Sequence, residues 1–446
     1  MSLVSIRERS ADGDESWQAG LDFDGEGDFP LTISDPFAEE DEGLLRWYFE
    51  RHLEFPFADR DLAKAARQGI VRYGETLFRQ VFGDRDAYAR YRSLAEQGFS
   101  GARFEVSGSP EFQRVHWETL KDPKFSEPLA LRAPLVRKTG KTQTLAAVSR
   151  SSPTINLLLV TARPQGSRDV GYRVISQPLV QQLRQANLHV QVDVVRPGTY
   201  EALVSHLEQT TADHGRGHYH VIHLDLHGAL LEHGRLQHLA LDGFTYAVAL
   251  SEIEVYEGQR AFLFFEGEQE GNAVPVLDTK LADLLTTHGI LVAILNACQS
   301  GMQAGESEAS LVSRLVQGGV QLALGMSYSV TVSAAERMMP VLYRELFAGR
   351  DLATAIRLAR QDLHQDKRRR AYFQQQIELE DWLLPVVYQN REVSFELRQF
   401  TPEEEAAYHE RQAVAFSEPR PEYGFVGRDR ARELLPEGSS DLIQIP

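Results

Sequence analysis

The chain has 446 residues, of which 42% are hydrophobic and 25% charged, values typical of a globular protein of about two or three domains. Its 64 Asp and Glu residues outnumber its 47 Lys and Arg residues, and the net charge of −17 argues against a general binder of phosphate backbones. The acidity is uneven, because residues 1–60 hold 16 Asp and Glu against 5 Lys and Arg.

The sequence also lacks the signs of a secreted or membrane protein. It has no apolar run of about 18 residues or more, and its N-terminus lacks the apolar stretch of a secretory signal. Its single cysteine, Cys298, excludes an internal disulfide framework and any Cys-rich zinc or iron–sulfur centre. We therefore expect a cytoplasmic protein without a cofactor, whose one thiol needs an explanation.

The first part of the chain, residues 1–137, is predicted to be a small acidic α+β region. Strand-like runs occur at Val4–Arg7 and Trp17–Phe23, and amphipathic helices are expected at Glu42–Glu54, Asp61–Phe82 and Asp86–Ala95. We find no chemical motif here, so a packing or docking role is expected. Residues 138–153 are polar and are predicted to be a linker. The Gly-Lys-Thr within them is not a P-loop, because Leu135 stands where that motif requires glycine.

Residues 154–395 alternate strand and helix patterns of similar length. This alternation predicts an α/β fold with a doubly wound, mostly parallel sheet. The expected strands are Ile155–Val160, His189–Val195, Tyr219–Leu226, Ala261–Phe265, Ile290–Leu295, Val320–Leu324 and Trp382–Tyr388. The expected helices are 173–187, Tyr200–Asp213, 277–288 and 308–317, with two more capped by Ser333, whose capping-box partner is Glu336, and by Asp351. Residues 396–446 have the composition of a polar linker.

Two of the predicted strands end in residues that can carry chemistry. The strand Tyr219–Leu226 stops at His227-Gly228, and the strand Ile290–Leu295 runs into Asn296-Ala-Cys298-Gln-Ser-Gly301. Sites in such sheets lie beyond the carboxyl ends of the strands. A cysteine nucleophile needs a base for its proton and N–H donors for the developing oxyanion, and a glycine lets a carbonyl approach its N–H closely. A buried inert thiol and a core histidine are the simpler alternatives for Cys298 and His227 taken singly.

These residues resemble the CHAT-domain family of caspase-like cysteine peptidases, in the clan that includes caspases, separase and gingipains. The resemblance covers roughly residues 150–390. It rests on His227-Gly228 and Asn296–Gly301, and then on Ser310–Val320, Tyr343–Leu346, Ala355–Arg360 and Asp381–Tyr388. It implies a caspase-like fold, Cys298 as the nucleophile and His227 as general base and acid. It further implies an oxyanion hole made by the backbone N–H groups of Gly228 and Cys298.

The sequence departs from the family in the segment Ser329–Ser333. Many relatives carry an acidic residue there, and in separase-like enzymes it helps to receive a basic P1 side chain, whereas this segment has none. Asp225 precedes His227 by two residues and shares its strand face, so it is a candidate for the acidic floor of a substrate pocket. An Asp225 that is ion-paired within the fold is the alternative.

Two rival functions remain open. His218, His220, His223, Asp225 and His227 crowd together in sequence, which suggests zinc binding and a zinc hydrolase. Their spacing does not match the His-x-His-x-Asp-His pattern of metallo-hydrolases, and no second ligand group is evident downstream, so we expect no metal. The other rival is a catalytically silent caspase-like scaffold, which the acidic N-terminal region would suit.

The end of the chain indicates a signalling context. Residues Tyr423–Arg430 resemble the Phe-Val-Gly-Arg start of STAND-type signalling NTPases, although no P-loop follows before Pro446. We therefore expect either an effector separated from its sensor or a truncated chain. The cluster Lys367–Arg370 is predicted to be a solvated helix end rather than a nucleic-acid contact. The leading hypothesis is a regulated bacterial signalling or defence peptidase that acts on a protein substrate and is controlled by an NTPase, a sensor module or a separate activator.

Overall fold

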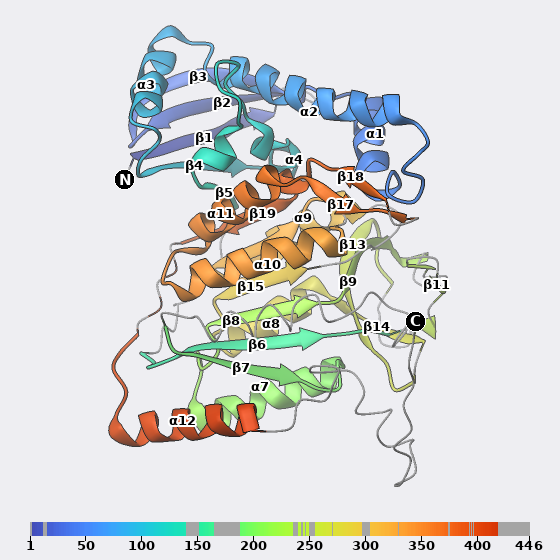
Figure 1. The fold of residues 1–446 in the computed structure, drawn as a ribbon, viewed down its shortest axis with the longest axis vertical. Coiled ribbons are helices and arrows are strands. Elements are labelled where there is room, and N and C mark those ends of the chain that lie inside the picture. The colour runs from blue at the N-terminus through green and yellow to red at the C-terminus, as the bar shows by residue number, and fades with distance from the viewer. Residues whose placement is uncertain are drawn as a thin grey trace.

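The structure is a computed structural model (Figure 1). It describes residues 2–11, 16–139, 151–164, 188–234, 240–241, 244–245, 247–248, 255–269, 271–296, 304–328, 330–372, 375–391, 393, 395 and 397–417.

One large twisted sheet runs through the described part of the molecule (Figure 1). Its eleven strands follow the order β3 (Glu26–Ser34), β2 (Ser16–Phe23), β1 (Ser2–Ala11), β4 (Ala102–Gly108), β5 (Leu135–Thr139), β19 (Pro385–Gln389), β16 (Leu322–Met326), β15 (Val292–Asn296), β8 (Val221–Asp225), β6 (Ile155–Thr161) and β7 (Val190–Val195). The strands from β7 to β16 are mutually parallel, and β19 is antiparallel to β16. The predicted α/β class with a mostly parallel sheet is confirmed.

The apolar run of β6 shows why helices cover both faces of this sheet. Successive strand residues point to opposite faces. Leu157 and Leu159 accordingly join one core with α10 (Val332–Phe347) and α11 (Leu352–Gln365). Leu158 and Val160 join the other core, which is built with α7 (Tyr200–His214), α8 (Asp278–Thr287) and α9 (Ala304–Gln317). A strand buried on both sides needs apolar residues throughout, as its sequence has.

The N-terminal strands extend this same sheet. β1 pairs in parallel with β4, β4 with β5, and β5 with β19, while α2 (Arg60–Val81) and α3 (Arg85–Glu96) cover a third core. The helix α1 (Glu39–Glu50) packs instead on the core of α10 and α11. β3, β4 and β5 were not expected from the sequence. β4 and β5 carry Arg103 and Arg137, which look like surface residues but are buried beside Gln389 and Glu118 respectively.

The expected strand Ala261–Phe265 belongs to a different sheet, so its assignment to the parallel sheet was wrong. It forms β13 (Gln259–Glu266), which is antiparallel to β9 (His227–Glu232) and β14 (Asn272–Leu277). β12 (Ala247–Val248) completes this sheet, and β10 (Ala240–Leu241) pairs with β11 (Phe244–Thr245). A short apolar run is equally compatible with burial in either sheet, so the sequence could not separate them.

The helix caps and the last described segment of the C-terminal half differ in part from the sequence prediction. Thr331, not Ser333, caps α10, because its side chain accepts a hydrogen bond from the Ala334 N–H at 3.0 Å. The segment after residue 400, expected to be a linker, forms α12 (Pro402–Ser417). Asp351 caps α11 as predicted. The expected helix at 173–187 and most of the linker 138–153 lie outside the described residues.

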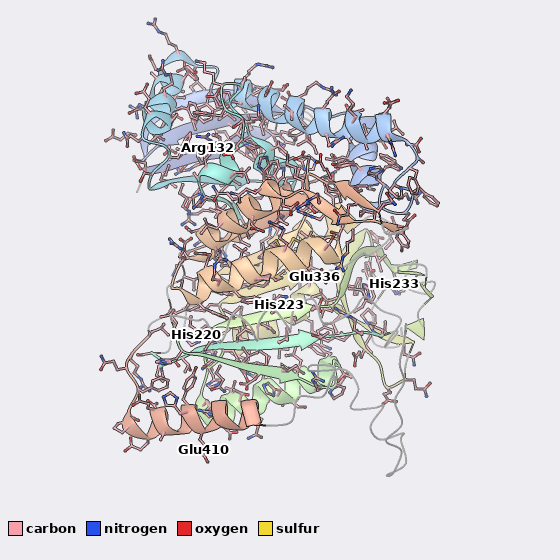
Figure 2. The ribbon with its side chains drawn as sticks, in the orientation of Figure 1. Arg132, His220, His223, His233, Glu336 and Glu410 are labelled. Carbon is pink, nitrogen blue, oxygen red and sulfur yellow. The ribbon has the colours of Figure 1, made fainter. Side chains whose placement is uncertain are left out.

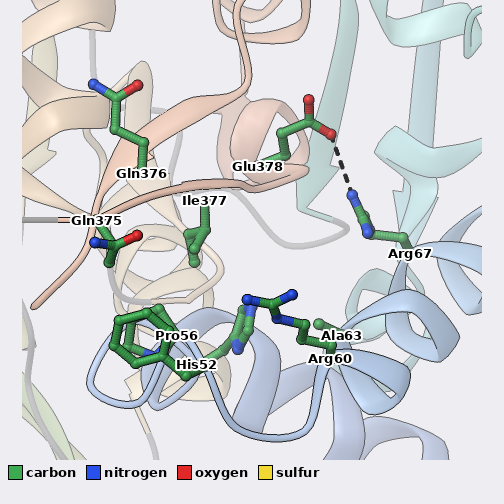
Figure 3. Close-up of a pocket in the computed structure, with 10 residues that line it drawn as sticks. His52, Pro56, Arg60, Ala63, Arg67, Gln375, Gln376, Ile377 and Glu378 are labelled. Atoms are coloured by element: carbon green, nitrogen blue, oxygen red, sulfur yellow. Dashed lines mark hydrogen bonds and ion pairs between the residues drawn. The ribbon is translucent and has the colours of Figure 1, made fainter.

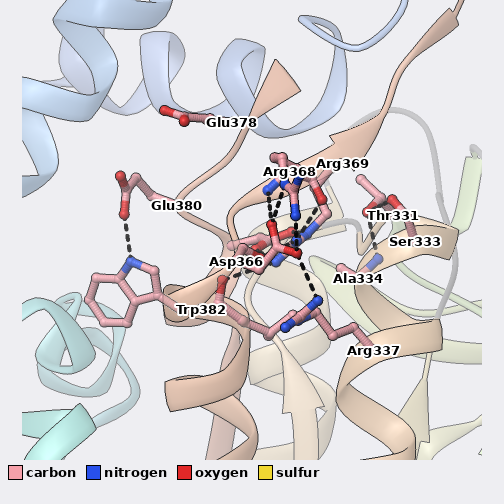
Figure 4. A network of polar contacts seen from close by, with 12 residues as sticks. Thr331, Ser333, Ala334, Arg337, Asp366, Arg368, Arg369, Glu378, Glu380 and Trp382 are labelled. Carbon is pink, nitrogen blue, oxygen red and sulfur yellow. Dashed lines mark hydrogen bonds and ion pairs between the residues drawn. The ribbon is translucent and has the colours of Figure 1, made fainter. Parts of the chain in front are cut away.

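The basic cluster Lys367–Arg370 is not a solvated helix end. Residues Arg368–Arg370 form β17, which pairs with β18 (Gln376–Glu378). The middle arginine, Arg369, is buried and donates two hydrogen bonds to the Asp381 carboxylate at 2.6 and 2.7 Å (Figure 4). Strand alternation sends the side chains on either side of it to the solvent. The hairpin is therefore anchored by a buried ion pair.

Candidate active site

The described half of the candidate site is the junction of the two sheets. β8 ends at Asp225 in the middle of the large sheet, and the chain enters β9 of the second sheet at His227. His227 lies opposite Phe264 of β13, and Gly228 lies opposite Leu263. The His227 side chain is only 3% exposed. The junction thus places His227 and Gly228 at the carboxyl edge of the parallel strands, where sites of this fold class occur.

The neighbouring strand β15 ends at the same edge, at the first residue of the second motif. β15 is parallel to β8, and its last residue, Asn296, lies opposite Asp225. His227 follows Asp225 by two residues, and Cys298 follows Asn296 by two residues in the sequence. Cys298 itself lies outside the described residues. The two strands that precede His227 and Cys298 are adjacent and parallel, and their last residues, Asp225 and Asn296, lie opposite each other.

Gly228 is buried, yet its packing does not require a glycine. A Cβ built there would meet Leu263 Cδ2 and the Phe262 carbonyl oxygen at 3.6 Å and Leu311 Cδ1 at 3.8 Å, which are ordinary contact distances. Gly198 behaves differently, because a Cβ there would lie 2.2 Å from the Thr161 carbonyl oxygen. The glycine after His227 is therefore not explained by the described scaffold alone.

Asp225 is paired within the fold. Its carboxylate forms an ion pair with the guanidinium of Arg163, which also donates to the Asp225 carbonyl oxygen at 2.7 Å. Asp225 is 2% exposed, and its Oδ1 has no hydrogen-bond partner among the described residues. This is the alternative that the sequence left open.

Arg163 and Glu266 belong to the same polar edge and were not singled out from the sequence. Arg163 follows the end of β6 and donates its backbone N–H to Glu266 Oε1 at 2.9 Å, while Glu266 Oε2 accepts from the Gly198 N–H at 3.1 Å. Glu266, at the end of β13, thereby joins the ends of β6 and β7. The strand-end rule that identified His227 would also have selected Arg163, because it follows the strand predicted at Ile155–Val160.

The histidines around β8 have separate partners. His223 is fully buried, stacks on Tyr343 of α10 and shares a hydrogen bond with its hydroxyl, and burial lowers its pKa to about 4 against the opposing effect of Asp225. His220 Nδ1 accepts from the Asn156 N–H at 3.0 Å, at the other end of the strand (Figure 2). The His218 ring stacks on His214. Across the described ranges, no three His, Cys, Asp or Glu side chains are grouped so that they could hold a metal ion.

The N-terminal region contacts the residue just before the segment that departs from the family pattern. Tyr328, which follows β16, donates a hydrogen bond to Glu42 of α1, and Glu42 also contacts His116. Tyr328 directly precedes the segment Ser329–Ser333, of which Ser329 lies outside the described residues. A helix of the N-terminal region is therefore fixed against the residue that leads into this segment.

The family model for the CHAT domain matches residues 72–408, from the second half of α2 into α12. The chain belongs to the CHAT-domain family. The family predicted from the ordered set of motifs between His227 and Tyr388 is confirmed, and the match takes in β4 and β5 as well as the strands that precede His227 and Cys298.

Solved structures that resemble this CHAT-domain chain are distant from it. The Saccharomyces cerevisiae separase–securin complex gives 10% identity and a TM-score of 0.43, with 87% of this chain and 30% of that chain covered. The Drosophila initiator caspase Dronc gives 10% identity and a TM-score of 0.30, with 59% of this chain and 95% of that chain covered. The chain thus spans about 30% of the separase chain that it matches. No curated protein gives a significant match, and none of the described helices is long and apolar enough to cross a bilayer.

Proposed function

We propose that this CHAT-domain protein is a cysteine endopeptidase in which Cys298 is the nucleophile and His227 the general base and acid. The observation that carries the proposal is the parallel register of β8 and β15, which aligns the strand ends from which His227-Gly228 and Cys298 follow. Membership of the CHAT-domain family supports it. The zinc hydrolase receives no support from the disposition of the β8 histidines.

The proposed chemistry needs only groups of the chain and water. His227 takes the thiol proton of Cys298, and the thiolate sulfur attacks the scissile carbonyl carbon. The backbone N–H groups of Gly228 and Cys298 hold the negative oxygen of the tetrahedral intermediate. The protonated His227 then gives its proton to the leaving amine, and a water molecule activated by His227 hydrolyses the thioester.

We assign to Asp225 a role in holding the site rather than in binding a basic P1 side chain. A basic P1 group would have to share the Asp225 carboxylate with the guanidinium of Arg163. Two cations at one carboxylate repel each other in a buried environment, so the arrangement disfavours a second one. Asp225 and Arg163 instead fix the end of β8 immediately before His227. A P1 preference set by Asp225 through its Oδ1 remains the alternative.

The biological role that we propose is a regulated bacterial signalling or defence effector. The resemblance of residues Tyr423–Arg430 to the start of a signalling NTPase supports it, and these residues lie outside the described part of the chain. Such an enzyme would cleave a protein partner under the control of an NTPase, a sensor module or a separate activator. The contact of α1 with Tyr328 supplies a physical connection between the N-terminal region and the neighbourhood of the site.

Because Cys298 is the one cysteine of the sequence, its substitution removes every thiol from the chain. The full chain is incubated with a pooled peptide library and cleavage is followed by mass spectrometry, for the wild type, Cys298→Ala, His227→Ala and the control His409→Ala, which alters an exposed histidine of α12. The first two variants should abolish cleavage and the control should not.

The alkylation rate of Cys298 by iodoacetamide, measured against pH, should lose its low-pH component in His227→Ala. Cleavage at the wild-type rate by either active-site variant would refute the dyad, and a thiol with an ordinary titration and no cleavage would favour the scaffold function.

A further inference from the structure

A cavity of about 250 Å³ lies between the N-terminal region and the β17–β18 hairpin (Figure 3). One wall consists of the turn after α1 and the start of α2, with His52, Phe57, Arg60 and Arg67. The other wall is β18 and the residue before it, with Ile377 and Glu378 among its side chains. No residue of the proposed peptidase site lines this cavity. Its chemistry therefore requires a separate explanation.

The cavity is cationic, although the chain is strongly acidic. Arg60 has no carboxylate within ion-pair distance among the described residues, and the one acidic residue of the lining, Glu378, contacts Arg67 at 3.2 Å. α2 starts at this cavity with Asp59 as its N-cap residue and Asp61 in its first turn; the Asp59 side chain makes no capping hydrogen bond, so the first N–H groups of the helix lack a side-chain acceptor. The two guanidinium groups, of which that of Arg60 has no carboxylate partner among the described residues, favour an anion.

A buried histidine provides independent evidence of a ligand. His52 lines the cavity, is only 5% exposed, and its Nδ1 has no hydrogen-bond partner within the described part of the chain. A buried polar group without a partner costs free energy. A bound anionic group with its own hydrogen-bonding atoms would supply such a partner. His52 and the two arginines thus point to one bound group rather than to unrelated surface charges.

The lining of the cavity is mostly polar, but exposed apolar side chains accompany it and bear on the kind of anion. One of the six large hydrophobic side chains that are exposed in the described structure, Phe57, lines the cavity. Phe55 and Leu62 are sequence neighbours of the lining residues Pro56 and Ala63, and the Tyr372 carbonyl oxygen accepts a hydrogen bond from the backbone N–H of the lining residue Gln375 at 3.3 Å. Tyr372 belongs to the hairpin side and donates its backbone N–H to the Leu53 carbonyl oxygen on the opposite side. Inorganic phosphate would leave these side chains uncovered. A peptide would cover them on either side of a carboxylate.

We propose that this cavity binds an acidic side chain of a partner peptide, with hydrophobic residues of the peptide on Phe57 and its exposed neighbours. Arg60 and Arg67 hold the carboxylate, and His52 hydrogen-bonds to the bound segment. Glu378 competes with the ligand for Arg67. The site acts independently of the peptidase chemistry and is open to test even in a chain without cleavage activity.

The experiment measures binding of fluorescent hexapeptide pools to the full chain carrying Cys298→Ala, by fluorescence polarisation. One pool has a central Glu flanked by Leu, Ile, Phe or Tyr, and the matched pool has Gln in place of Glu. The Glu pool should bind at least about fivefold more tightly than the Gln pool, because it forms charge-assisted hydrogen bonds with the arginines. Equal binding of the two pools, or no binding of the Glu pool, would overturn the proposal.

Variants of the walls separate this site from general charge attraction. Arg60→Glu and Arg67→Glu should each weaken binding about tenfold or more, whereas Arg72→Glu, on the same helix but outside the cavity, should not. Phe57→Ala should weaken binding, and Val71→Ala, an exposed apolar residue of α2 away from the cavity, should not. Glu378→Gln should strengthen binding by freeing Arg67, a gain that mere damage to the fold would not produce. Equal losses in Arg72→Glu and Arg67→Glu, or tighter binding of inorganic phosphate than of the Glu pool, would refute the peptide site.

Discussion

His116 and Glu42 form a half-buried ion pair between the connection after α4 (Pro110–Arg114) and helix α1, with Nε2 and Oε2 3.0 Å apart. Burial alone would raise the pKa of Glu42, but His116 and the hydrogen bonds that Glu42 accepts from His116 and Tyr328 lower it to about 2. Burial alone would lower the pKa of His116, but the Glu42 carboxylate outweighs burial and raises it. Both groups are therefore charged from about pH 2 up to the raised pKa of His116.

This pair predicts how stability changes with pH. The contribution of His116 is fully present below its unfolded pKa of about 6.5 and is lost as the pH rises through its higher folded value. The contribution of Glu42 is present above 4.5 and is lost as the pH falls through about 2. The free energy of unfolding, measured by urea denaturation, should thus fall as the pH rises above about 6.5.

Two variants isolate this effect. His116→Gln removes the titrating group, so its pH profile should lack the decline that the wild type shows above neutrality. His409→Gln, in exposed α12, should retain that decline. Parallel profiles for the wild type and His116→Gln would show that the ion pair does not set the pH dependence.

The pair of Arg163 and Asp225 predicts a stability effect at the site. Replacing Arg163 by Met leaves a buried carboxylate without its cation, which should lower the free energy of unfolding by about 3–5 kcal/mol. The double variant Arg163→Met with Asp225→Leu removes both charges and should cost less than the sum of the single changes. Arg92→Met, which breaks an exposed pair with Glu96, should cost less than about 1 kcal/mol. Additive losses in the double variant would mean that the two side chains are not coupled.

The strands of the parallel half were predictable because burial on both faces requires a continuous run of apolar residues. A strand such as β6 is apolar along its length since both faces are covered. β4 and β5 escaped prediction because Arg103 and Arg137 break that run. Arg103 donates a hydrogen bond to the neutral side chain of Gln389, 286 residues later, and lies 3.5 Å from Glu105. The charge of Arg137 is matched by Glu118, in the 3-10 helix Trp117–Thr119. Arg369 and Asp381 show the same limit, since tertiary partners and not local pattern decide whether an arginine is buried.

The candidate site was predictable for a related reason. A parallel sheet brings the carboxyl ends of its strands to one edge, so His227-Gly228 and the strand preceding Cys298 could be placed together from the alternation of elements. The second sheet could not be predicted, because the residues at the junction between β8 and β9 show no sequence pattern typical of a turn. The cavity at His52 also had no sequence signal, since its walls come from segments more than 300 residues apart.

The capping residue of α10 offers a local test of the fold. The Thr331 hydroxyl accepts from the Ala334 N–H, so Thr331→Val, which keeps the shape and removes the hydroxyl, should lower the free energy of unfolding by about 1 kcal/mol. Thr331→Ser keeps the hydroxyl and should restore most of that loss. Urea denaturation of the two variants measures the difference. Equal stability of the Val and Ser variants would mean that α10 is capped by another residue.

A substitution of Gly228 distinguishes a role in packing from a role in catalysis. Since a Cβ at this position would meet only ordinary contacts, Gly228→Ala should fold with a free energy of unfolding within about 1 kcal/mol of the wild type. The proposed oxyanion hole requires the substrate carbonyl to approach the Gly228 N–H, and the added methyl group would crowd that approach. Removal of one oxyanion donor typically costs about a hundredfold or more in kcat, so partial obstruction should lower kcat at least about tenfold.

The control for Gly228→Ala is a glycine whose packing is tight. Gly198→Ala places a Cβ 2.2 Å from the Thr161 carbonyl oxygen, so it should lower stability together with activity. Thermal unfolding and the rate of peptide cleavage are measured for both variants. A stable Gly228→Ala variant with unchanged kcat would remove the Gly228 N–H from the oxyanion hole, while leaving the assignments of Cys298 and His227 to their own tests. A stable variant with reduced kcat would show that the glycine after His227 serves the substrate and not the fold.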